Sequence, residues 1–155
     1  MRQLACETQA ELRSLVFELR PPRLAADGLV ATVGKDLEVL GRAHGLKADL
    51  RINGTLALSS TVEVELYRIV QEALNNAVRH ARAEAIEVDV DAVGGMVTIT
   101  VRDDGVGFDP AASAIRERRL GLTSMRERAE SLGGTLTVET APRSGTTVRV
   151  EVPSG

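Results

Sequence analysis

The sequence predicts an α+β fold, a two-layer α/β sandwich in which helices cover one face of a mixed sheet and a helical segment precedes it. The predicted strands outnumber the helices that could cross between them, and they mostly come as neighbouring pairs joined by short turns, as in hairpins. The predicted helices are amphipathic, so each has an apolar face to lay on the sheet. With 155 residues the chain is long enough for one domain with a core and a helical appendage.

Two helices are expected at the start of the chain. Leucine and valine residues follow a helical spacing over residues 12–19, and Pro21-Pro22 ends that helix. A second helix is expected from about Asp27 to His44, where Gly45 is a suitable end.

The longest helix is expected to begin at Ser60, which can form a capping box with Glu63. Apolar residues at helical spacing form one continuous face of it up to Val78. The opposite face is polar and contains Asn75-Asn76, although asparagine lowers helix propensity. The asparagine pair therefore calls for an explanation other than helix stability.

The remaining chain is expected to alternate between strands, one long loop and one helix. Gly94-Gly95 marks a hairpin turn. Residues 105–120 show little apolar periodicity, so we expect a long loop, and long loops in compact domains often serve as lids. A helix from about Leu122 is closed by Gly133-Gly134. Strands are expected at residues 47–52, 86–91, 97–102, 135–140 and 146–152.

Composition excludes several classes of function. The formal net charge is −3, which gives no general attraction to nucleic acid or anionic lipid, and aromatic residues make up only 2% of the chain, too few for base stacking. The single cysteine, Cys6, excludes an internal disulfide and a cysteine-cluster metal site. No signal peptide or membrane-spanning run is present, so we expect a cytoplasmic domain without direct membrane contact.

Glu72 and Asn76 are the first candidate site residues. Residues four positions apart lie on one helical face, and carboxylate and amide oxygens are ligands that Mg²⁺ accepts. Asn76 is the candidate metal ligand, and Glu72 is the candidate catalytic residue, which would orient or deprotonate a water. Such pairs are also common on solvent-facing helices, so the spacing alone leaves both interpretations open. Likewise, His80 is either a hydrogen-bonding residue at the helix end or a nucleotide contact.

Two glycine-containing segments are the next candidates. In Asp103-Asp104-Gly105-Val106-Gly107, one aspartate can accept a hydrogen bond from an exocyclic amino group while the glycines let a base lie against the backbone. The same residues also suit an ordinary acidic turn. Gly121-Leu122, expected at a helix start, can offer backbone N–H groups to phosphates, or is simply a glycine at a helix start. Together with Glu72 and Asn76, these segments suggest a site for a magnesium nucleotide.

The order and spacing of these motifs resemble the ATP-binding superfamily of DNA gyrase B, heat-shock chaperones, mismatch-repair ATPases and sensor histidine kinases. The fit is best to the histidine kinases that partner response regulators with helix-turn-helix output domains. The matching segments are Gln71 to Ala81 (asparagine box), Asp103 to Pro110 (first glycine box), Gly121 to Ala129 with Leu132-Gly133-Gly134 (second glycine box), Gly145 to Val148 (strand entry near the adenine), and Leu12-Arg13 with Glu18 to Pro22 (end of a dimerisation hairpin).

The resemblance implies a Bergerat-type fold with ATP and Mg²⁺ as cofactors. Asp103 would recognise the adenine amino group, with Gly105, Gly107 and Thr146 shaping the base pocket. Asn76 would bind Mg²⁺, and Glu72 would act as a base or would only organise magnesium and water. The resemblance places four further residues near the phosphates: Arg79, His80, Gly121 and Leu122.

The resemblance also implies how the chain is organised and what it does. Residues 1–22 would be the second helix of a dimerisation hairpin, and residues 23–155 the ATP-binding catalytic domain. The domain would transfer the γ-phosphoryl of ATP to a histidine on the first hairpin helix of a homodimeric parent, which would then serve a response regulator. Neither His44 nor His80 stands in the acceptor setting. We therefore expect a fragment that binds Mg-ATP without phosphorylating itself, whose parent is either soluble or anchored with this domain facing the cytosol.

Two other functions fit the same motifs. A serine kinase of the anti-sigma-factor type uses the same nucleotide fold, although the proline exit after the first helix favours the histidine kinase. A degenerate module that only docks a partner would not bind ATP. A gyrase-like hydrolase is disfavoured because that class carries an additional transducer domain.

Overall fold

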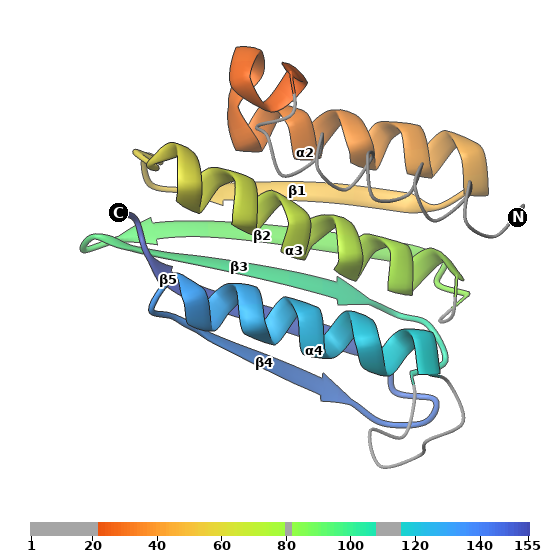
Figure 1. Ribbon diagram of the computed structural model, residues 1–155. Coiled ribbons are helices and arrows are strands. Elements are labelled where there is room, and N and C mark those ends of the chain that lie inside the picture. The colour runs from red at the N-terminus through yellow and green to blue at the C-terminus, as the bar shows by residue number, and fades with distance from the viewer. Residues whose placement is uncertain (1–21, 80–81, 108–115) are drawn as a thin grey trace, which may run out of the picture.

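The computed structural model describes residues 22–79, 82–107 and 116–155. In this part of the chain a five-stranded sheet has the strand order β1-β2-β3-β5-β4 (Figure 1). The strands are β1 (Lys47–Asn53), β2 (Ala85–Val93), β3 (Met96–Asp103), β4 (Thr135–Thr140) and β5 (Thr146–Pro153). All five expected strands are present, with ends within two residues of those predicted.

The sheet is mixed, as predicted. β1 runs parallel to β2, because the chain crosses over through a helix between them. The other three pairings are antiparallel, and two of them are hairpins: β2–β3, which turns at Gly94-Gly95, and β4–β5. The positive φ angles of 61° and 78° at these glycines are those that a two-residue hairpin turn requires.

Three helices lie on one face of the sheet, α2 (Pro22–His44), α3 (Ser60–Arg79) and α4 (Arg116–Ser131), as Figure 1 shows. The core lies between the two layers and is built from leucine, valine, isoleucine and alanine. In β2, alternate residues from Ile86 to Val90 are buried on the helix side. The predicted α+β class and the covering of one face are therefore confirmed.

The start of α2 differs from the sequence prediction. The helix begins at Pro22, five residues before Asp27, and continues through a kink at Gly28, whose φ is 84° and ψ 171°. Thr32 Oγ1 donates a hydrogen bond to Gly28 O (2.7 Å). Periodicity locates the packed face of a helix but not an extra turn before a glycine kink, so this start was not visible in the sequence.

Helix α3 begins where predicted, at Ser60. Ser59, the preceding residue, caps the helix, because its Oγ accepts a hydrogen bond from Val62 N (3.3 Å). None of the helices in the described ranges is long and apolar enough to cross a bilayer.

Candidate functional site

Four segments meet at one end of the sheet, at the right of Figure 1: the last turn of α3, the end of β3, the first turns of α4 and the β4–β5 turn. The end of β3 and the start of β5 are hydrogen-bonded neighbours, since Asp103 pairs with Thr146. Helices α3 and α4 touch close by, since a Cβ on Gly121 would overlap Glu72 Oε1 and lie 3.0 Å from Glu72 Cδ. Residues far apart in the sequence, and predicted separately, are thus brought to one place.

Glu72 and Asn76 occupy neighbouring turns in the second half of α3. Both side chains are half-buried, whereas Asn75 between them is exposed. The apolar face of α3 packs on the core, with Ala73 and Ala77 buried. The arrangement presents one carboxylate and one amide oxygen on the flank of α3 that faces α4, a donor set suited to a hydrated divalent cation.

Two contacts fix α3 against its neighbouring helices. Tyr67 donates a hydrogen bond to Asp36 Oδ2 of α2 (2.6 Å), and Glu65 forms a 2.7 Å ion pair with Arg128 of α4. Burial of the Tyr67 phenol raises its pKa well above the usual range, and the hydrogen bond to Asp36 raises it further. These contacts set where the helix carries Glu72 and Asn76.

Asp103 ends β3 on the side of the sheet that the helices cover. The strand alternates, with Val97, Ile99 and Val101 buried, so the next residue of that register is Asp103, which is half-buried. Its Oδ1 accepts a hydrogen bond from Gly105 N (2.9 Å). The carboxylate is therefore oriented by the turn that follows it.

The glycine turn after β3 packs backbone to backbone against the β4–β5 turn. A Cβ on Gly107 would overlap Ala141 O, and one on Gly145 would overlap Asp103 O. Both glycines also have positive φ, 64° and 72°. Glycine is thus required twice at this corner, for space and for conformation, which an ordinary exposed acidic turn would not demand.

Thr146 lies beside Asp103 at the start of β5. The Oγ1 atoms of Thr140 and Thr146 are 2.9 Å apart, within hydrogen-bond distance. Thr140 Oγ1 also reaches Gly145 O (3.3 Å). The hydroxyl of Thr146 is held at the same edge as the Asp103 carboxylate.

Gly121 and Leu122 are not at the start of a helix, and this part of the prediction is wrong. Helix α4 begins at Arg116, so Gly121 lies inside it, buried and against Glu72. The loop that was expected to extend to Leu120 therefore ends before Arg116, because residues 116–120 are helical. Arginine and glutamate favour helices but show no apolar periodicity, and Leu120 is 62% exposed. A helical turn without apolar periodicity therefore looks like a loop in the sequence. Residues 108–115 lie outside the described residues.

Arg79 is the last residue of α3 and is exposed, at the same end of the sheet. His80 lies outside the described residues, so its predicted contact is not located. His44 ends α2 and is exposed. Within the described ranges, histidine, cysteine, aspartate and glutamate form no group of three that could hold a metal by protein ligands alone.

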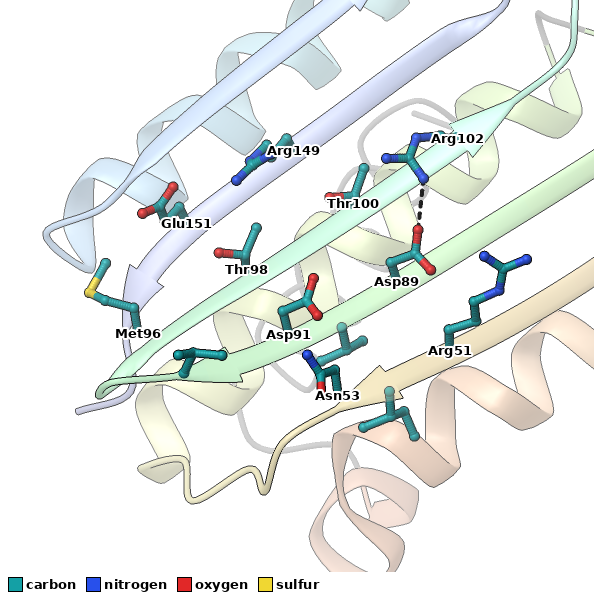
Figure 2. Close-up of a pocket in the computed structure, with 13 residues that line it drawn as sticks. Arg51, Asn53, Asp89, Asp91, Met96, Thr98, Thr100, Arg102, Arg149 and Glu151 are labelled. Atoms are coloured by element: carbon teal, nitrogen blue, oxygen red, sulfur yellow. Dashed lines mark hydrogen bonds and ion pairs between the residues drawn. The ribbon is translucent and has the colours of Figure 1, made fainter.

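A hollow of about 710 Å³ lies elsewhere, on the face of the sheet away from the helices (Figure 2). Its lining is mostly polar and contains both basic and acidic side chains, of which Arg102 and Asp89 form a 2.7 Å ion pair. It contains none of the predicted site residues. We interpret it as the solvated face of the sheet.

Two features of the site have no signal in the sequence. The contact between Gly121 and Glu72 joins residues 49 positions apart, and the packing of Gly107 on Ala141 joins residues 34 apart. Both close approaches exist only in the folded structure, where these distant segments pack against each other. The glycines were predicted as site residues, but for base and phosphate contacts.

The fold is that of an ATPase-type domain, because residues 61–155 match the model of the histidine kinase-, DNA gyrase B- and HSP90-like ATPase family. This match covers more than half of the chain, so the chain belongs to that family.

Among curated proteins, the relatives are sensor histidine kinases. The chain is 32% identical to the histidine-protein kinase/phosphatase DegS of Brevibacillus brevis, covering 99% of this chain and 39% of that protein. It is 34% identical to the sensor histidine kinase LiaS of Bacillus subtilis (99% and 42%) and 35% identical to the histidine-protein kinase/phosphatase UhpB of Salmonella typhimurium (99% and 30%). The chain therefore spans less than half the length of these relatives.

Solved structures show the same fold. The histidine kinase domain from the Erythrobacter litoralis EL346 blue-light activated histidine kinase matches with a TM-score of 0.68 at 25% identity, over 81% of this chain and 61% of that one. Full-length ShkA in complex with AMPPNP matches with a TM-score of 0.66 at 21% identity, over 81% of this chain and 29% of that one.

Proposed function

We propose that this chain binds Mg-ATP and serves as the catalytic domain of a sensor histidine kinase, placing the γ-phosphoryl of ATP for transfer to a histidine that is not among residues 1–155. The observation that supports this best is that the last turn of α3, which carries Asn76, and the end of β3, which carries Asp103, lie at one end of the sheet (Figure 1), beside two turns whose backbones only glycine allows. The family match and the histidine kinase relatives point to the same chemistry.

The adenine would be read at the end of β3. The Asp103 carboxylate accepts hydrogen bonds and has no proton to donate when ionised, so it suits the exocyclic amino group of adenine. The hydrogen bond from Gly105 N–H to Oδ1 orients this carboxylate at the end of the strand. Gly105, Gly107 and Thr146 would form the wall of the base pocket.

The phosphates and Mg²⁺ would lie between α3 and α4. The half-buried amide of Asn76 and carboxylate of Glu72 fit the oxygen donors that Mg²⁺ prefers, and the ion keeps several waters, so few protein ligands suffice. Bound Mg²⁺ would neutralise charge on the phosphate oxygens. Glu72 would orient or deprotonate a water, and Arg79 would approach the phosphates, together with His80.

Transfer itself needs position more than covalent chemistry from the protein. We propose that residues 1–22 belong to a dimerisation hairpin and residues 23–155 to the catalytic domain. In the homodimeric parent an acceptor histidine on that hairpin would take the phosphoryl group and pass it to a response regulator, of the helix-turn-helix type in this group. His44, exposed at the end of α2, is not proposed as the acceptor.

Calorimetric titration with ATP in the presence and absence of Mg²⁺ tests this function. We expect Mg-ATP to bind the wild-type chain. Asp103→Ala should weaken binding by ~100-fold or more, because the adenine amino group would lose its charged acceptor. Asn76→Ala should remove mainly the part of the affinity that depends on Mg²⁺.

Wild-type affinity in Asp103→Ala would defeat the adenine assignment, and no binding by the wild-type chain would defeat the function as a whole. The isolated chain, incubated with ATP labelled at the γ-phosphate, should keep no acid-labile, base-stable phosphate. Stable labelling would place the acceptor histidine within these residues and contradict that part of the proposal.

A further inference from the structure

Two consecutive aspartates end β3, and the structure gives them different partners. Asp103 is held by the turn that follows it, through Gly105 N. Asp104 reaches in the other direction: its Oδ1 accepts hydrogen bonds from Glu84 N (2.8 Å) and Ala85 N (2.9 Å). Its own backbone N–H donates to Ala85 O (3.3 Å). Asp104 therefore joins the end of β3 to the start of β2.

The segment that Asp104 holds is the one that leaves α3. Five residues, 80 to 84, separate the end of α3 from the start of β2. Near the end of this connection Arg82 has a positive φ of 50°, uncommon for a residue with a side chain, and Ala83 is buried. Glu84 O accepts a hydrogen bond from Lys47 N of β1 (2.9 Å). Only two residues separate Arg79 from Arg82, so the covalent length of the chain limits how far the anchored end can lie from the last turn of α3.

That last turn carries Asn76 and Arg79. We infer that Asp104 is a positioning residue, which sets the distance between the end of α3 and the adenine-reading Asp103 by anchoring the α3–β2 connection to the residue after Asp103. The inference rests on the proposed function, since it assigns the role of Asp104 within that site. Asp104 does not itself touch the nucleotide.

The two hydrogen bonds to Asp104 predict which property of its side chain is needed. The two N–H groups need an acceptor oxygen one methylene from the backbone, and they do not need a charge. The amide introduced by Asp104→Asn keeps an acceptor oxygen at the same reach. This variant should therefore bind Mg-ATP within ~3-fold of wild type, because neutral acceptors still form these bonds. Asp104→Glu keeps the charge but moves the oxygens by one methylene and should bind more weakly than Asp104→Asn.

Asp104→Ala removes both hydrogen bonds and should weaken Mg-ATP binding by ~10-fold or more. The matched control is Asp91→Ala, which removes an aspartate from the open face of the same sheet and should bind as the wild type does. Calorimetric titration of these four variants, each below its own unfolding transition, gives the order of affinity. Asp104→Glu binding better than Asp104→Asn would show that the charge acts on the nucleotide and would overturn the inference. So would wild-type affinity in Asp104→Ala.

Hydrogen–deuterium exchange supplies a readout that does not depend on ATP. Asp104→Ala should raise exchange at the amides of Glu84 and Ala85 and in the last turn of α3, from Asn76 to Arg79, whereas Asp91→Ala should not. If only Glu84 and Ala85 respond, Asp104 holds the strand start without positioning α3, and the inference fails. If the wild-type chain does not bind Mg-ATP, the proposed function fails, but the exchange comparison still decides the link between Asp104 and α3. Should Asp104→Ala not fold, the order of Asp104→Asn and Asp104→Glu decides it.

Discussion

Replacing Gly121 by alanine tests how closely α4 must approach the carboxylate of Glu72. A Cβ at this position would overlap Glu72 Oε1 and lie 3.0 Å from Cδ and 3.4 Å from Cγ. Ordinary separations between carbon atoms are about 3.5–4.0 Å, so the carboxyl group must move by ~0.5–1 Å or more. The clash is with the end of a flexible side chain, so the backbone of the two helices need not separate.

We expect Gly121→Ala to reduce Mg²⁺-dependent ATP binding more than it reduces the stability of the fold. Alanine in a helix interior is favoured over glycine by about 1 kcal/mol. Moving Glu72 off its preferred rotamer costs about 0.5–1.5 kcal/mol, so the two effects nearly cancel and the free energy of unfolding should change by less than ~1 kcal/mol. A reacting arrangement displaced by about 1 Å can lose ~100-fold in rate. We therefore expect near-normal thermal unfolding and a loss of ~10-fold or more in the Mg²⁺-dependent part of ATP affinity, with a larger loss in phosphoryl transfer.

The assay is calorimetry with and without Mg²⁺ on a double-mutant cycle. If Gly121 acts through Glu72, Gly121→Ala should cause little further loss in a Glu72→Ala background, where the clashing atoms are absent. Gly34→Ala is the matched control, because Gly34 is also helical and its Cβ would meet Leu50 Cδ2 at an ordinary 3.6 Å. It should stabilise the chain by about 0.5–1 kcal/mol without changing affinity.

Two results would refute this reasoning. One is an unchanged Mg²⁺-dependent affinity in Gly121→Ala. The other is an equal loss in the wild-type and Glu72→Ala backgrounds, which would mean that Gly121 contributes through its own backbone.

Two further predictions concern the contacts that hold α3. Tyr67→Phe removes the hydrogen bond to Asp36 and should lower the free energy of unfolding by about 1–3 kcal/mol. The folded state raises the pKa of Tyr67 above its ordinary 10.0, so the phenol of the unfolded chain loses its proton at a lower pH. The stability that Tyr67 contributes is therefore complete below pH 10 and declines as the pH rises further. Denaturation followed between pH 8 and pH 11 should show a steeper decline for wild type than for Tyr67→Phe, and parallel curves would contradict the assignment. The pair between Glu65 and Arg128, 25% and 30% exposed, should show a coupling energy of about 0.5–1 kcal/mol that weakens in high salt; a coupling of zero at low salt would show that α3 and α4 are held by apolar packing alone.

The elements of the sheet could be predicted because their signals are local. Alternation in β2 and β3, Gly94-Gly95 between them and the periodic face of α3 each depend on neighbouring residues. The boundaries of α2 and α4 could not, because their first turns continue no apolar period that is visible in the sequence. Charged residues such as those at 116–119 suit both a helix and a loop, so the sequence does not decide between them.

The candidate site also has one part that the sequence predicts and another that only the tertiary structure decides. Spacing along the chain marks Glu72, Asn76 and Asp103 as candidates, since a carboxylate four residues from an amide and an acidic residue before a glycine turn are both visible in the sequence. What each residue touches depends on how α3 and α4 lie on the sheet. The tertiary structure placed Gly121 against Glu72 instead of at a helix start, and it gave Asp104 the amides of Glu84 and Ala85. Hydrophobic patterning acts over a few residues and selects the elements, whereas close packing between distant segments determines which polar atoms meet.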